Sequence, residues 1–260
     1  MKISACIITY NHEQFIRKCL EGAIAQKLDI DYEIIIGEDL SSDKTFEICY
    51  EYASRYPDLI TLISGPSNLG MVDNWIRTIQ NCSGNYIAIC EGDDYWTDPF
   101  KLQKQVEFLN CNPAFSICGH GVLVDNGSPI VAFQKKFSYS FNFVKYISLG
   151  KKFATCTLVF RNKFLDSSII NLIKTSSFVD FPLEAGLLIK GPGFYFKNVM
   201  ATYRKQPSGA TSSKNFYRKS MYLKFKLLLQ IANGKNVRIK LFCYIHSFRF
   251  YLKYLKNIFF

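Results

Sequence analysis

The chain has 260 residues, of which 48% are hydrophobic and 20% are charged, a composition typical of a folded globular protein rather than a disordered one. The length allows one large α/β domain with or without a small appendage. The net charge of +11 is unevenly placed, because residues 185–260 hold 15 Lys and Arg and no Asp or Glu, whereas residues 1–184 hold 17 Lys and Arg against 21 Asp and Glu. A mildly acidic body with a strongly basic end suggests contact with a membrane or a nucleic acid.

The nine cysteines include no Cys-x-x-Cys pair and are odd in number, which indicates reduced thiols. Residues 1–9 lead directly into a strand pattern and lack the long apolar segment of a signal peptide. No stretch approaches the roughly 18 apolar residues of a membrane-spanning helix. We therefore expect a cytoplasmic protein.

In the first half of the chain, strand patterns alternate with helix patterns. Strands are expected at 2–9, 32–37, 59–63 and 86–90. Helices are expected with Phe15, Cys19, Leu20, Ala23 and Ile24 on one face, then at 46–55, at 71–81 and from Phe100 onward. Ser41, Ser42 and Asp43 suit the N-cap of the helix 46–55. This alternation predicts an α/β fold with a doubly wound, mainly parallel sheet.

The second half of the chain is less regular. Residues 115–124 and 129–133 have strand patterns joined by Asp125-Asn-Gly127, a strong signal for a hairpin turn. Further strands are expected at 155–160, 194–196 and 199–203, and helices at 163–173 and 183–189. Residues 137–152 are aromatic without a clear period, and residues 207–214 are rich in Ser, Gly and Lys, as in a linker.

Three carboxylates, Glu91, Asp93 and Asp94, follow the apolar strand 86–90. Clustered acids at the end of a buried strand are unfavourable unless positive charge lies beside them. A divalent cation that carries a nucleotide diphosphate would supply this charge, because such ions bind one or two carboxylates together with phosphate oxygens. The alternative is a solvated acidic turn that caps the next helix.

Polar loops follow each of the first four expected strands. They are residues 9–11, 38–43, 68–70 and 91–94. In doubly wound sheets, ligands bind at the carboxyl ends of the strands, where the strand order reverses. The four loops are therefore predicted to form one site.

These landmarks together resemble the inverting family-2 glycosyltransferases of the GT-A fold. The matching segments are Ile7-Ile-Thr-Tyr-Asn11, Gly37-Glu-Asp-Leu-Ser-Ser-Asp-Lys-Thr45, Asn68-Leu-Gly70, Glu91-Gly-Asp-Asp-Tyr-Trp96 with Pro99-x-Lys-Leu102, Asp180-Phe-Pro-Leu183 and Tyr203-Arg204. The likeness covers about residues 1–206, with a nucleotide-sugar half at about 1–110 and an acceptor half at about 111–206. It implies a GT-A domain at 1–206. Residues 207–260, which the likeness does not cover, are predicted from their own pattern to form a basic, aromatic helical tail.

The resemblance also implies roles for individual residues. Thr9, Tyr10 and Asn11 would border the nucleotide base, and Asp39 would accept a hydrogen bond from it. Asn68 belongs to the same nucleotide-sugar site. Asp93 would lie near the ribose or the metal, Asp94 would bind Mg²⁺ or Mn²⁺, and Asp180 would be the general base. The chain departs from the family pattern at Glu91, where the family has Asp, and at Gln206, where the family often has His.

Asp180 lies between Phe178-Val179 and Phe181-Pro182, an apolar setting that should raise its pKa. Its alternative role is the N-cap of the helix that follows, and Glu184, one turn further on, is the fallback base.

Other residues have structural alternatives as well. Asp94 and Asp39 could each cap a helix, although Ser41, Ser42 and Asp43 are nearer to the helix that Asp39 would cap. We expect His12 to be a surface residue of a turn, and Tyr95 and Trp96 to pack against their neighbours.

The tail at 215–260 alternates aromatic and basic residues. Tyr222, Phe225 and Leu229, and then Phe248, Tyr251, Leu252 and Leu255, recur at helical spacing. Two amphipathic helices with Asn233-Gly234 between them would account for this pattern. They would either lie on an anionic membrane or pack back on the domain with their charges in solvent. Nucleic acid is not expected, because no known binding motif is present and the helix faces are rich in Phe and Leu.

The resemblance implies transfer of a hexose from a nucleotide-diphosphate sugar, first of all a UDP-sugar, to a saccharide or lipid-linked saccharide. The setting would be the synthesis of a bacterial-type surface polysaccharide, lipopolysaccharide or capsule, peripheral at the inner face of the plasma membrane. A nucleotidyltransferase that makes nucleotide sugars would need a Gly-rich basic loop after the first strand, where this chain has Thr-Tyr-Asn-His. A non-catalytic nucleotide-sugar-binding module would not need the acids at 93, 94 and 180.

Overall fold

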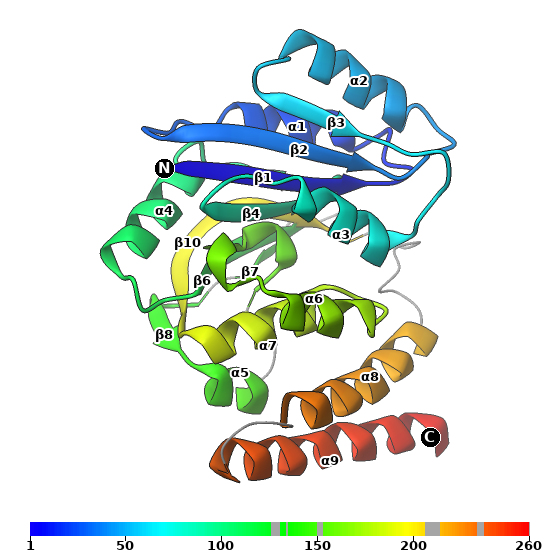
Figure 1. The fold of residues 1–260 in the computed structure, drawn as a ribbon, viewed down its shortest axis with the longest axis vertical. Coiled ribbons are helices and arrows are strands. Elements are labelled where there is room, and N and C mark those ends of the chain that lie inside the picture. The colour runs from blue at the N-terminus through cyan, green and yellow to red at the C-terminus, as the bar shows by residue number, and fades with distance from the viewer. Residues whose placement is uncertain (126–130, 134, 150–152, 206–213, 233–236, 260) are drawn as a thin grey trace.

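A computed structural model describes the chain except for residues 126–130, 134, 150–152, 206–213, 233–236 and 260 (Figure 1). The strands are β1 (Lys2–Thr9), β2 (Asp31–Glu38), β3 (Ile60–Ile63), β4 (Tyr86–Glu91), β5 (Tyr95–Trp96), β6 (Ile117–Asp125), β7 (Val131–Phe133), β8 (Tyr139–Phe141), β9 (Val159–Arg161) and β10 (Gly193–Arg204). They form one sheet in the order β3-β2-β1-β4-β9-β6-β10-β5, with β7 beside β6 and β8 beside β10.

The helices cover both faces of this sheet. They are α1 (Ile16–Ile24), α2 (Thr45–Arg55), α3 (Met71–Gln80), α4 (Lys101–Cys111), α5 (Phe143–Leu149), α6 (Ser167–Lys174), α7 (Asp180–Lys190), α8 (Lys214–Ala232) and α9 (Val237–Phe259), with two 3-10 turns, η1 (Thr155–Thr157) and η2 (Asn162–Phe164). Ile3, Ala5 and Ile7 of β1 pack in a core with α1, α2 and α4, whereas Cys6 points to a second core with α3 and α5–α9. Because side chains alternate along a strand, the apolar run of β1 serves both cores.

The parallel half of the sheet confirms the predicted α/β architecture. β1 pairs in parallel with β2 on one side and β4 on the other, and β2 pairs in parallel with β3. The strand order therefore reverses between β1 and β4, which is the place where ligands bind in doubly wound sheets. The register sets Ile8 opposite Glu91, so the carboxyl ends of these two strands are side by side.

The second half of the chain completes the sheet with mixed pairing. β9 is antiparallel to both β4 and β6, and β10 is parallel to β6. β10 also pairs with β5, with Thr202 opposite Tyr95. This pairing brings the end of β10 to the loop that follows β4.

Three predictions for this half need correction. Residues 155–157 form a 3-10 turn, not a strand, because the Thr157 hydroxyl donates to the Ala154 carbonyl, and β9 begins only at Val159. The helix expected from residue 163 begins at Ser167, where the Asp166 carboxylate accepts hydrogen bonds from the backbone of the first turn. The two closing strands are one strand, β10, with irregular pairing between Phe196 and Val199. The hairpin β6–β7 is confirmed, and its turn lies outside the described residues.

The tail forms two antiparallel helices, as the sequence predicts, and these pack on the domain (Figure 1). Within the α8–α9 pair, the Phe225 and Tyr251 rings lie 5.2 Å apart. α9 contacts the domain through two aromatic side chains. The centre of the Phe242 ring lies 6.3 Å from that of Phe143 in α5, and the centre of the Phe250 ring lies 6.3 Å from that of Phe181 in α7. Residues 207–213 of the predicted linker lie outside the described residues.

None of the helices in the described part of the chain is long and apolar enough to cross a membrane. All nine cysteines are free thiols, as expected, and eight of them are buried.

Candidate active site

The loop that carries the acids is fixed at the strand-order reversal. The Gly92 N–H donates to the Ile8 carbonyl at 2.9 Å, which ties the loop to the end of β1. A Cβ at Gly92 would lie 2.6 Å from the Thr9 hydroxyl oxygen and 2.9 Å from Nδ1 of His12. Only glycine leaves room for this close approach. The loop and the predicted residue Thr9 are thus in direct contact.

Asp94 is turned into the protein. Its side chain is 1% exposed, and Oδ1 accepts a hydrogen bond of 2.8 Å from the Arg204 backbone N–H at the end of β10. Burial raises the pKa of Asp94 well above its usual value, and the charges of Glu91 and Asp93 add to this effect. The helix-capping alternative for Asp94 is wrong, because Asp98 supports the start of α4 by accepting from the Phe100 N–H.

Asp93 has a different environment from its neighbour. It is half-buried, and its backbone carbonyl accepts from Nη1 of Arg204 at 2.8 Å. The Arg204 guanidinium also lies 4.4 Å from the centre of the Tyr95 ring, a cation–π distance. The loop therefore presents one carboxylate toward the surface with an arginine beside it.

His12, expected on the surface, is half-buried against this loop. Its Nδ1 lies 3.2 Å from the Thr9 hydroxyl oxygen, and its backbone N–H donates to the Thr45 hydroxyl. Burial lowers the pKa of His12, and the charges of Asp93 and Asp43 oppose this shift. The sequence gives no sign that His12 is covered, and it marks Arg204 only as part of the Tyr203-Arg204 landmark. The position of Arg204 at the end of the last strand of the sheet was the available signal.

Asp39 and Asn68 are brought together at the end of β2. The buried Asp39 carboxylate accepts from the N–H groups of Leu69 and Gly70, both at 2.9 Å, and the Asn68 amide donates to the Asp39 carbonyl at 2.7 Å. Asp39 therefore holds the 68–70 loop against the sheet. It does not cap α2, since the Thr45 N–H donates to Asp43 instead.

Tyr10 and Asn11 occupy the turn after β1. The side-chain oxygen of Asn11 accepts from the Ser42 N–H at 2.9 Å, and Asn11 has a positive φ of 53°, a conformation that Asn tolerates better than most residues. The loops after β1 and β2 are joined in this way. Tyr10 is exposed at this edge, with its ring in solvent.

Asp180 is the first residue of α7, in the acceptor half. Its Oδ1 accepts from the Phe181 N–H at 2.8 Å, while Val179 is the N-cap and has no side-chain cap bond, so the N-cap alternative is wrong. Lys224 of α8 lies 5.3 Å from the centre of the Phe181 ring, which places a cation beside this end of α7.

Glu184, the fallback base, is fully buried in α7. Burial raises the pKa of the neighbouring Tyr146 hydroxyl well above its usual value, and the charges of Glu184 and Asp180 add to the shift. The half-buried Asp180 is thus the more accessible of these two carboxylates.

The donor chemistry of the acid loop suits a hard cation. Glu91 and Asp93 offer carboxylate oxygens, the ligand type that Mg²⁺ and Mn²⁺ prefer. Within the described residues, no three or more His, Cys, Asp or Glu side chains are grouped as a ready-made metal site. An ion here would need further oxygens from a ligand such as a diphosphate. Gln206, the second departure from the family pattern, lies outside the described residues.

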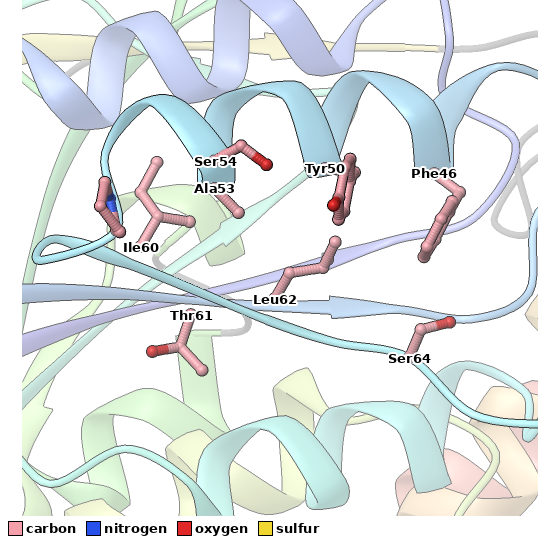
Figure 2. Close-up of a pocket in the computed structure, with 9 residues that line it drawn as sticks. Phe46, Tyr50, Ala53, Ser54, Ile60, Thr61, Leu62 and Ser64 are labelled. Atoms are coloured by element: carbon pink, nitrogen blue, oxygen red, sulfur yellow. The ribbon is translucent and has the colours of Figure 1, made fainter.

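A surface groove of about 540 Å³ lies elsewhere, between α2 and the edge strand β3 (Figure 2). It is lined by Phe46, Tyr50, Ala53, Ser54, Pro57, Ile60, Thr61, Leu62 and Ser64. None of the predicted site residues lines it. The candidate site rests on the loops at the carboxyl ends of β1, β2 and β4 and not on this groove.

The family model described as Glycosyl transferase family 2 matches residues 4–168, more than half of the chain. The chain belongs to glycosyl transferase family 2. The matched segment includes the parallel half of the sheet, except for the first two residues of β1, and the acid loop. It ends before α7 and β10, which contribute Asp180 and Arg204.

Relatives cover a shorter part of the chain. The chain is 44% identical over 122 residues to the uncharacterized protein Rv1520 of Mycobacterium tuberculosis. This aligned segment is 47% of this chain and 35% of Rv1520. It is 32% identical over 123 residues to the putative glycosyltransferase EpsE of Bacillus subtilis, 47% of this chain and 44% of EpsE. The chain thus matches less than half the length of these relatives.

Solved structures match almost the whole chain at low identity. TarS of S. aureus, in complex with UDP-GlcNAc, superposes with a TM-score of 0.69 at 16% identity and covers 100% of this chain and 73% of the TarS chain. The mannosyltransferase PcManGT of Pyrobaculum calidifontis, in complex with GDP-Man and Mn²⁺, superposes with a TM-score of 0.62 at 12% identity. This match covers 98% of this chain and 71% of the PcManGT chain. These matches show the GT-A fold.

Proposed function

We propose that the protein transfers a hexose from a nucleotide-diphosphate sugar to an acceptor hydroxyl, with inversion at the anomeric carbon. One observation carries the proposal: the acid loop lies at the strand-order reversal, with Asp93 half-buried at the carboxyl end of β4 and Arg204 beside it. An anionic diphosphate fits a site that combines an arginine with a carboxylate able to share a cation. The family and the GT-A fold support the same chemistry.

The nucleotide end of the donor is assigned to the turns after β1 and β2. The exposed Tyr10 ring offers a stacking surface for the base, and Asn11 and Thr9 border it. Asp39 and Asn68 fix the wall formed by the 68–70 loop, and an Asp39 oxygen also accepts from the base. TarS holds UDP-GlcNAc on the same fold, which makes a UDP-sugar the first donor to test.

Asp93 is assigned as the main protein ligand for Mg²⁺ or Mn²⁺, with Glu91 near it. When bound, such an ion supplies positive charge to a departing diphosphate. Asp94 is assigned a supporting role, because its buried carboxylate holds the end of β10 and so positions Arg204. PcManGT, which has the same fold, holds Mn²⁺ with GDP-Man.

Asp180 is assigned as the general base. It removes the proton from the acceptor hydroxyl as that oxygen attacks the anomeric carbon from the face opposite the diphosphate. The bond between the anomeric carbon and the diphosphate oxygen breaks, and the diphosphate keeps the electron pair. Attack from the opposite face inverts the configuration. The proposed acceptor is a saccharide or lipid-linked saccharide of a surface polysaccharide.

The test is donor turnover with UDP-, GDP- and dTDP-hexoses, with Mn²⁺ or with EDTA. We expect one donor to be cleaved only with Mn²⁺, and a disaccharide of inverted configuration to form with a suitable acceptor. Asp93→Asn should abolish turnover, whereas Asp58→Asn, at an exposed position on the loop before β3, should leave it unchanged. Formation of a nucleotide sugar from a nucleoside triphosphate and a sugar phosphate would instead identify a nucleotidyltransferase.

A further inference from the structure

The outward face of α9 carries a row of exposed apolar side chains. The row consists of Tyr244, Ile245, Phe248 and Leu252, which are 42 to 57% exposed. Tyr244, Phe248 and Leu252 are spaced four residues apart, and Ile245 is three residues before Phe248, so the four share one side of the helix. We call this row the α9 stripe.

The opposite side of α9 already has its partners. Cys243, His246 and Ser247 are buried, and Phe250 packs against Phe181 of α7. Tyr251, which the sequence grouped with Phe248 and Leu252, instead contacts Phe225 of α8. α9 therefore has two apolar sides, one that docks on the domain and one that faces solvent. A helix that is apolar on more than its core side has a second apolar partner.

The charge around the stripe is of one sign. Lys240 and Arg249 are exposed on α9, and Lys226 is exposed on α8. In the sequence, residues 214–259 hold 11 Lys and Arg and no Asp or Glu. An apolar stripe with only basic neighbours complements a surface that is apolar below and anionic at its face. A second copy of the chain is a poorer partner, because two such stripes would bring two basic surfaces together.

We propose that the α9 stripe binds the surface of an anionic lipid bilayer, with its apolar side chains among the headgroups and upper acyl chains. Lys240 and Arg249 then lie at the level of the lipid phosphates. The α8–α9 pair both packs on the domain and binds the membrane, so the two alternatives raised by the sequence are compatible. α9 packs on α7, which begins at Asp180, and the bilayer would therefore lie on the acceptor side of the molecule. That last consequence alone rests on the proposed function.

The test is binding of the full chain to vesicles, measured by co-sedimentation. Vesicles of phosphatidylcholine mixed with phosphatidylglycerol should bind the protein, and vesicles of phosphatidylcholine alone should bind it weakly. The double variant Ile245→Ser/Phe248→Ser should lose at least about tenfold in affinity, since each side chain loses its apolar burial. Lys240→Gln/Arg249→Gln should lose about 30-fold on the anionic vesicles only.

Phe46→Ser/Tyr50→Ser is the matched control, because it removes two exposed aromatic side chains from the groove on α2, far from the tail in the sequence. It should bind vesicles as the wild type does. Equal affinity of the wild type and Ile245→Ser/Phe248→Ser would overturn the proposal. So would a dimer in solution that the stripe variant abolishes without any vesicle binding by the wild type.

A second readout does not depend on removing the stripe. In a Phe248→Trp variant, tryptophan emission should shift to shorter wavelength when anionic vesicles are added. The native residues Trp75 and Trp96 are buried, so they contribute a constant background. An unchanged emission spectrum while the protein co-sediments would show that another surface binds, and would overturn the assignment to α9.

Discussion

The parallel half of the sheet and the α8–α9 pair are held together by different kinds of contact. In the parallel half, buried strands run straight into polar loops, and backbone bonds tie these loops to one another, as at Gly92 and Asp39. The α8–α9 pair has few polar contacts among the described side chains and is held by aromatic and aliphatic packing. We infer that the first region positions charged groups, while the second presents an apolar surface.

The largest expected effect is that of Asp180→Asn, at the start of α7, which lies outside both regions. The change keeps the size of the side chain and removes the proposed base. Loss of a general base lowers turnover by roughly 10² to 10⁴. We expect such a loss in kcat, with donor affinity and thermal midpoint unchanged. Steady-state kinetics and donor titration measure it. Turnover within about threefold of the wild type would assign the base elsewhere.

A matched pair of core substitutions compares the stability of the two regions. Leu102 of α4 and Leu228 of α8 are both fully buried leucines. Leu102→Ala should lower the free energy of unfolding of the whole domain by about 2 to 5 kcal/mol. Leu228→Ala should release the tail locally, which hydrogen exchange would report in α8 and α9 but not in β1 or β4. Equal loss of protection throughout the chain in both variants would show that the tail is part of the same cooperative unit.

Lys101 gives a pH-dependent test within the parallel half. Its side chain is fully buried over the Trp96 ring, Nζ has no hydrogen-bond partner among the described residues, and burial lowers its pKa to about 8. In the unfolded chain the lysine keeps its proton to higher pH, so the wild type gains stability as pH rises from about 8 toward 10.5. Below pH 8 the full penalty of the buried charge is present.

Lys101→Met should therefore stabilise the protein at pH 7 by about 3 kcal/mol, and this advantage should shrink between pH 8 and 10. The difference in the free energy of unfolding between wild type and variant, measured in urea at several pH values, isolates Lys101 from the titratable groups that both proteins share. A constant difference across this range would contradict the assignment.

The smallest expected effect concerns the contact between the acid loop and β1. In Gly92→Ala the new methyl group meets the Thr9 hydroxyl and His12, which should cost about 1 to 3 kcal/mol and weaken donor binding. Asp58→Asn, at an exposed position on the loop before β3, is the control. Urea unfolding and donor titration distinguish the two variants. Unchanged donor binding in Gly92→Ala would mean that the loop is not part of the site.

The sequence predicts the parallel half well because strand and helix periods there are strong. The capping residues expected for α2 are not its N-cap, which is Lys44 and makes no side-chain cap bond. The sequence does not separate Asp93 from Asp94, since two adjacent carboxylates look alike in one dimension. What separates them is Arg204, 110 residues later, whose backbone captures Asp94 when β10 joins the sheet. Such a distant contact leaves no local pattern.

The burial of several polar side chains could not be predicted from the sequence either, because it also depends on contacts between residues far apart in the chain. Lys101 and Arg161 have the residue types of a surface, yet Arg161 donates to the Phe115 carbonyl and to the Tyr86 hydroxyl inside the protein. His12 is covered by a loop that follows it by 80 residues. In the tail, helical spacing is clear from the sequence, but which side of α9 packs inward depends on the position of α7.

The most direct test of the site is nucleotide diphosphate binding as a function of Mn²⁺, measured by calorimetry with UDP. The account predicts that Mn²⁺ tightens UDP binding to the wild type and to Asp58→Asn, and that Asp93→Asn removes this enhancement. Binding of UDP to Asp93→Asn with the wild-type dependence on Mn²⁺ would contradict the assignment of Asp93. Failure of UDP, GDP and dTDP to bind the wild type at all would contradict the placement of the site at the carboxyl ends of β1 and β4.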